Sequence, residues 1–117
     1  MKVEKLFYNQ LSFLENNYGF SFTIKTIGID KKYIFENNGF EIGFFTRISQ
    51  FDATCFFYYS INAKETILNI DDEFYKLFKR KSKKNHFWQL GVIIKEQLKE
   101  HRIFNYYVKN TENNSLS

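Results

Sequence analysis

The sequence predicts an α+β fold in which a four-stranded antiparallel meander follows one amphipathic helix and precedes two further helices. Three observations support this fold class. Apolar residues recur at three- and four-residue spacings near both ends of the chain, as they do in helices. Between the ends, apolar and polar residues alternate as they do in strands. The pair Asn38-Gly39 interrupts this alternation and predicts a tight hairpin.

The 117 residues predict one globular domain over residues 1–109 and a frayed polar tail over residues 110–117. The first helix is expected over residues 3–18, and Gly19 ends it because glycine adopts a left-handed cap. Its apolar stripe consists of Val3, Leu6, Phe7, Leu11, Leu14 and Tyr18. A first strand with one solvated face is expected over residues 20–27, and Asp30-Lys31-Lys32 is expected to be a polar connection.

The tip of the central hairpin is expected at Asn38-Gly39, because a type I′ turn needs positive φ at both central residues. Counting outward pairs Asn37 with Phe40, Glu36 with Glu41, Phe35 with Ile42, Ile34 with Gly43 and Tyr33 with Phe44. Side chains alternate between the faces of a sheet, so Tyr33, Phe35, Ile42 and Phe44 are expected on one core face.

The next turn is interpreted as a four-residue loop from Gln50 to Ala53, which places Ser49 opposite Thr54. An even loop keeps the apolar columns on one side, whereas an odd loop would turn them to solvent. The expected core pairs are Ile48 with Cys55, Thr46 with Phe57, Phe44 with Tyr59 and Ile42 with Ile61. The expected pairs on the opposite face are Phe45 with Tyr58 and Arg47 with Phe56.

Two helices are expected after residue 61. The acidic residues before Phe74 favour a helix start, and a third helix is expected from about Asn85 to about His101. Gly91 in that helix would allow a close contact with the element beneath it. Residues 103–108 either continue the helix or form a short extended segment, and both alternatives remain open.

The net charge of +4 comes from one basic stretch. Residues 76–84 contain six basic and no acidic residues, whereas the rest of the chain has eleven basic and thirteen acidic residues. A nucleic-acid-binding module would use this stretch for phosphates and an aromatic ring for stacking. That alternative site consists of Lys79, Arg80, Lys81, Lys83, Lys84 and Trp88. The helix dipole alone also favours basic residues at a helix end.

The chain shows no residue set that indicates catalysis, so we expect a protein that is not an enzyme and uses neither a cofactor nor a metal. Cys55 is expected to be a small buried residue of a strand. Residues 1–10 carry charges where a signal peptide needs an apolar core, and no apolar run approaches the ~20 residues of a membrane helix. A cytoplasmic protein that does not bind membranes is therefore expected.

The face of the sheet opposite the core is too aromatic for a solvated surface. Contiguous apolar residues indicate either a covering element or a partner protein. We predict that this face binds another protein or, if no helix covers it, a second copy through stacked sheets. The predicted protein-binding residues are Ile34, Phe45, Arg47, Phe56 and Tyr58, with Glu36 and Glu41 beside the turn.

Residues 13–20 (Phe-Leu-Glu-Asn-Asn-Tyr-Gly-Phe), followed by residues 33–37 and Glu41-Ile42, resemble a group of small bacterial proteins in which such a helix end precedes a β-meander. Some members of the group are similar to immunity proteins of contact-dependent or polymorphic toxin systems. The resemblance spans the first half of the chain and implies a binding protein that blocks a toxin, without catalytic residues. A nucleic-acid-binding module and a small-ligand-binding domain are the alternatives.

Overall fold

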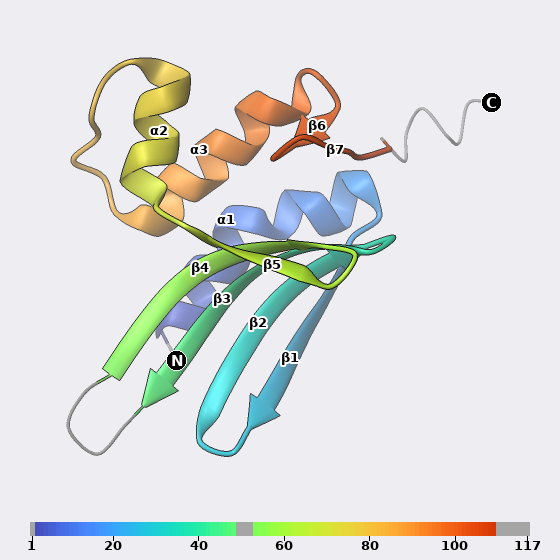
Figure 1. The fold of residues 1–117 in the computed structure, drawn as a ribbon, viewed down its shortest axis with the longest axis vertical. Helices are drawn as coiled ribbons and strands as arrows, with labels where there is room; N and C mark the ends of the chain where they lie inside the picture. Colours follow the sequence, from blue (N-terminus) through green and yellow to red (C-terminus); the bar gives the residue numbers. More distant parts are fainter. Residues whose placement is uncertain (1, 49–52, 110–117) are drawn as a thin grey trace. The chain divides into compact units, whose positions relative to one another are not determined.

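The computed structural model describes residues 2–48 and 53–109 (Figure 1). These residues form two compact units. Residues 20–68 form a sheet unit, and the segments on either side of it in the sequence form a helical unit.

The sheet unit is one antiparallel meander whose strands lie side by side in the order of the sequence. The fold class is α+β, as predicted, but the sheet has five strands and not four. The strands are β1 (Ser21–Ile27), β2 (Asp30–Asn37), β3 (Phe40–Ile48), β4 (Ala53–Ile61) and β5 (Lys64–Leu68). The additional strand β5 follows a tight turn at Asn62-Ala63, where both residues have positive φ. Alanine rarely adopts this conformation, so the sequence carried no turn signal there.

The register between β2 and β3 confirms every pair predicted from the hairpin tip. Asn38 and Gly39 have φ values of 49° and 84°, as a type I′ turn requires. The Glu36 carboxylate accepts a hydrogen bond from the Gly39 N–H at 3.3 Å. The turn therefore sets the pairing by its backbone conformation, and the Glu36 side chain supports it.

The register predicted between β3 and β4 is wrong by two residues. Phe44 pairs with Phe57 and not Tyr59, and Phe45 pairs with Phe56 and not Tyr58. The observed register places aromatic rings in contact on both faces, with centroids 5.0 Å apart in each pair. Because the displacement is even, each residue stays on its predicted face. The remaining observed pairs include Thr46 with Cys55, Ile42 with Tyr59, Arg47 with Thr54 and Ile48 with Ala53. Ser49 and Gln50 lie outside the described residues.

Two other predictions in this unit are corrected. Asp30-Lys31-Lys32 begins β2 and is not a connection, because Gly28-Ile29 forms the turn and Gly28 supplies the positive φ. Cys55 is exposed and not buried. It pairs with the half-buried Thr46, near the ends of β3 and β4 that are farthest from the hairpin tip, where the buried aromatic rows have ended.

The helical unit contains α1 (Lys2–Tyr18), α2 (Ile70–Phe78) and α3 (His86–Leu98). Asn69 and Asn85 cap α2 and α3, since their side-chain oxygens accept the backbone N–H groups of Asp72 and Trp88. The third helix ends at Leu98, earlier than expected. Residues 103–108 do not continue it, because β6 (Arg102–Ile103) and β7 (Tyr106–Tyr107) form a small hairpin.

Helices α1 and α3 pack closely at Gly91, where a Cβ would lie 3.1 Å from the Gln10 Oε1 atom. This confirms the expected close contact. Leu6, predicted on the apolar stripe of the first helix, is exposed, whereas Phe7 is buried. The buried apolar residues of this unit include Phe7, Leu11, Leu14, Phe74, Leu90, Ile93, Ile94 and Leu98.

Candidate functional site

The sheet is strongly coiled, and an ion pair between two distant strands shows it. Lys32 on β2 and Glu65 on β5 are joined by an Nζ to Oε2 distance of 3.3 Å. In a flat sheet, the register would separate them by three strand spacings and four residues along the strand, about 19 Å in total. A lysine and a glutamate cannot bridge that distance. The sheet must therefore curl toward the face that carries both charges, which we call the concave face (Figure 1).

The centre of the concave face is Tyr58, whose ring lies over Gly43 on the neighbouring strand. A Cβ at position 43 would overlap the Tyr58 ring, so only glycine allows this packing. The Lys32 ammonium lies 5.0 Å from the centroid of Tyr58 and 5.5 Å from that of Phe45. The Arg47 guanidinium also lies over the Phe45 ring, 5.4 Å from its centroid. Cationic side chains of the sheet itself thus cover its aromatic rings.

The predicted protein-binding residues lie together on this face, but three of the seven are buried. Ile34, Phe45 and Tyr58 are buried, Phe56 is half-buried, and Arg47 is exposed. Glu36 and Glu41 are cross-strand neighbours, as predicted, and are half-buried. Of the two alternatives left open for this face, a covering within the chain applies to Ile34, Phe45 and Tyr58. The sequence could not decide this, because alternation along a strand gives the face of a residue and not the curvature of the sheet.

The Tyr58 hydroxyl is buried and has no hydrogen-bond partner among the described residues. Burial raises the pKa of Tyr58 above its usual range, and the negative charges of Glu41 and Glu65 raise it further. A buried phenol without a partner destabilises the fold relative to a phenylalanine of the same shape. The Tyr58 ring therefore packs on Gly43, whereas its hydroxyl has no hydrogen-bond partner among the described residues.

The most accessible apolar feature of the sheet unit is the edge strand β1, which the sequence analysis did not single out. Among the strands formed by the described residues, β1 has a neighbour on one side only. The two-residue turn at Gly28-Ile29 makes Ile27 and Asp30 a hydrogen-bonded pair, and every second residue of β1 then bonds to β2. The backbone N–H and C=O groups of Phe22, Ile24 and Thr26 consequently point to the free edge.

Three exposed isoleucines lie on β1 and in the turn that follows it. Ile24 is 40% exposed, Ile27 is 55% exposed, and Ile29 in the adjoining turn is 68% exposed. Lys25 is the one charged residue of the strand. Charged residues normally protect an edge strand against pairing with other chains, and β1 has little of this protection.

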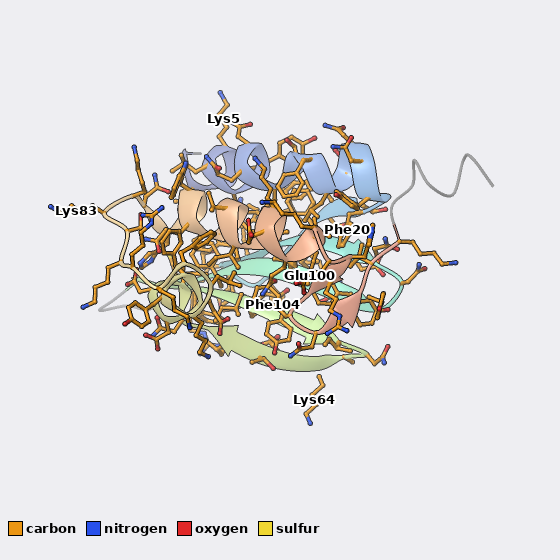
Figure 2. All side chains as sticks on the ribbon, turned by 90° about the horizontal axis from the view of Figure 1, so that it is seen from above. Lys5, Phe20, Lys64, Lys83, Glu100 and Phe104 are labelled. Atoms are coloured by element: carbon orange, nitrogen blue, oxygen red, sulfur yellow. The ribbon has the colours of Figure 1, made fainter. Side chains whose placement is uncertain are left out.

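The opposite edge, β5, is better protected. It carries Lys64 and Glu65, and Glu65 is engaged by Lys32. Lys64 points away from the ribbon in Figure 2. The exposed Ile67 is the apolar residue that remains at this edge. The two edges of one sheet therefore differ in their capacity to accept a further strand.

The basic residues of the alternative nucleic-acid site lie in the loop between α2 and α3 and at its ends. Lys79, Arg80, Lys81, Lys83 and Lys84 are exposed, and Figure 2 shows Lys83 projecting outward. The Arg80 guanidinium lies 5.3 Å from the Phe74 ring, and Lys84 lies 6.0 Å from the half-buried ring of Trp88. Two of the cations are thus arranged over aromatic rings of the same unit.

Acidic residues share this region with the basic loop. A pocket of about 500 Å³ is lined by Lys81 and Ser82 from the loop and by Asp71, Asp72 and Tyr75 from α2. His86 Nε2 lies 3.2 Å from both carboxylate oxygens of Asp71. These carboxylates reduce the positive field that phosphates would experience, so the loop is a region of mixed charge.

Among the described residues, no three His, Cys, Asp or Glu side chains are grouped so that they could hold a metal ion. No helix in the described part of the chain is long and apolar enough to cross a membrane. Comparisons of the chain with protein-family models, with curated proteins and with solved structures found no match in any of the three.

Proposed function

We propose that this chain is a non-enzymatic protein that acts by binding another protein, and that its binding surface is the free edge of β1. The observation that supports this function most directly is the combination of outward backbone groups at Phe22, Ile24 and Thr26 with the exposed Ile24, Ile27 and Ile29. A strand of a partner would pair with the backbone groups, and its apolar side chains would contact the isoleucines.

The most specific form of this proposal is a toxin-neutralising immunity protein. It rests on the resemblance of residues 13–20, and of residues 33–37 and 41–42 in the β2–β3 hairpin, to such proteins. A toxin strand paired with β1 would be held against the sheet, and the adjoining toxin surface would be covered. Arg47 on β3 and Phe56 on β4 would then lie outside the centre of the interface.

The test uses co-expression of the chain with the product of the gene immediately upstream, followed by affinity purification. Ile24→Pro removes an N–H that points to the free edge and leaves the β1–β2 hydrogen bonds intact. The matched control is Ile67→Pro, which removes an outward N–H from β5. We expect Ile24→Pro to abolish co-purification and protection of cells, and Ile67→Pro to retain both. A partner that binds both variants equally would contradict the proposed surface.

The nucleic-acid alternative is favoured by the exposed lysines of the basic loop and by the contact between Lys84 and Trp88. Gel shifts with random DNA and RNA at low salt test it. Because Asp71 and Asp72 share the pocket with Lys81, we expect binding no tighter than the micromolar range of non-specific contacts. Tight binding that is lost when Lys81, Lys83 and Lys84 become Ala would favour this alternative instead.

A further inference from the structure

The free edge of β1 is complementary to itself. We propose that two copies of the chain pair their β1 strands antiparallel about a twofold axis at Ile24 and so form one continuous sheet. This homodimer masks the edge at which another protein would bind. The masking role rests on the proposed function, whereas the dimer itself does not.

The phase of the backbone hydrogen bonds supports this arrangement. An axis at Ile24 places Ile24 opposite Ile24 of the second copy, and Phe22 opposite its Thr26. All of these residues direct their N–H and C=O groups to the free edge. Each pair would therefore exchange both of its backbone hydrogen bonds.

The positions of Lys25 and of the strand start favour this register over the registers with the axis one residue to either side. With the axis at Ile24, Lys25 lies opposite Thr23 of the second copy, and no like charges face each other. With the axis at Lys25, the two lysines would lie directly opposite one another, which destabilises a strand pair. With the axis at Thr23, Thr26 would lie opposite Phe20, which precedes the strand.

The exposed side chains also fit the second copy. The two Ile24 side chains would be direct cross-strand neighbours on the same face, and this pair buries apolar surface that the single chain exposes. Ile27 would lie opposite Ser21, a small residue that leaves room for it.

Pairing of β1 with β5 of another copy is the competing arrangement. Such a contact is heterologous and would continue into an open chain of molecules, whereas a β1–β1 pair closes after two copies. Lys64 and Glu65 protect β5 against this contact. The structure therefore favours a closed dimer over a filament.

Sedimentation velocity on the purified protein alone tests the dimer. For a strand-pairing interface of this small size, we expect the dimer fraction to rise between about 10 and 500 µM. Ile24→Pro should sediment as a monomer throughout this range, and Ile67→Pro should behave like the parent. A parent protein that stays monomeric, or an Ile24→Pro variant that still dimerises, would overturn the proposal. Circular dichroism checks that both variants are folded.

A second pair of variants tests the register. Thr23→Glu places a carboxylate opposite Lys25 of the second copy twice in each dimer and should tighten the dimer about threefold to tenfold. Thr23→Lys should weaken it by a similar factor, and both effects should shrink in high salt. Equal affinities for the two variants would contradict the axis at Ile24. If the dimer fails these tests while the upstream gene product still co-purifies through Ile24, the proposed function stands without the masking role.

Discussion

The two faces of the sheet are both rich in apolar residues, but these residues are shielded from solvent in different ways. On the core face, aromatic rings form rows across the strands, such as Tyr33, Phe44 and Phe57, and all three are buried. On the concave face, Tyr58 fills the space over Gly43, and Lys32 reaches over the rings to Glu65. The comparison teaches that a contiguous aromatic face is not by itself an interface, because a coiled sheet and its own long cations can cover it.

The largest expected effect is on the core face. Phe44→Ala should lower the free energy of unfolding by about 3 to 5 kcal/mol, since it removes a buried ring and leaves a cavity. Phe56→Ala, a half-buried ring on the concave face, is the matched variant and should lower it by less than half as much. Urea denaturation measures both values. Equal losses would remove the distinction between the two faces.

The next effect concerns the packing of Tyr58 on Gly43. Gly43→Ala should lower the free energy of unfolding by about 1 to 3 kcal/mol, because the added Cβ overlaps the tyrosine ring. The same substitution in a Tyr58→Ala background should be close to neutral, and a double-mutant cycle measures the difference. If the penalty is the same in both backgrounds, the overlap with Tyr58 is not its cause.

Removal of the Tyr58 hydroxyl is expected to stabilise the protein, unlike the substitutions above. Tyr58→Phe should raise the free energy of unfolding by about 1 kcal/mol, because it keeps the ring and removes a buried O–H that lacks a partner among the described residues. Thermal and urea denaturation at pH 7 measure the gain. A clear loss of stability would show that the hydroxyl has a partner in solution.

The same residue predicts sensitivity to alkali. Burial raises the pKa of Tyr58, so above pH ~10 the phenol ionises in the unfolded chain before it ionises in the folded one. The unfolded state then binds fewer protons, and stability falls by up to about 1.4 kcal/mol per pH unit. Other groups also titrate in this range, so the measurement is the difference between the parent and Tyr58→Phe. The stability gap between the two should widen as the pH rises above 10.

The smallest expected effect is that of the ion pair. Lys32→Met keeps an apolar stem over Phe45 and Tyr58 and removes the charge, so it should lower the free energy of unfolding by less than about 1 kcal/mol. The exposed Lys25, changed in the same way, serves as the control and should have no effect. A loss of several kcal/mol for Lys32→Met would mean that the ion pair, and not the packing of Tyr58, maintains the coil of the sheet.

Strand pairing could be predicted from the sequence where a turn residue gave a strong local signal. Asn38-Gly39 adopts the expected turn, and every pair counted from it is present. The Asn62-Ala63 turn has the same kind of conformation, but alanine does not indicate it, and β5 was missed. Between β3 and β4 no local signal set the register, and contacts between distant aromatic residues did so instead.

The candidate site was predictable only in part. Alternation placed Ile34, Phe45 and Tyr58 on one face, which is correct, but their burial depends on how far the sheet coils. The predicted meander already placed its first strand at an edge of the sheet. The exposure of Ile24 and Ile27 on that strand was not predicted, because it depends on what packs around the strand in the folded chain.

The sequence by itself determined the α+β class, the glycine cap at Gly19, the hairpin at Asn38-Gly39 and the faces on which the residues of β2, β3 and β4 lie. These features depend on backbone conformations and side-chain directions within a few residues. Only the tertiary structure decided the β3–β4 register, the coil that closes the concave face over Tyr58, and the exposure of the isoleucines at β1. Each of these results from contacts between residues far apart in the sequence, and their free energies depend on the shape of the whole sheet.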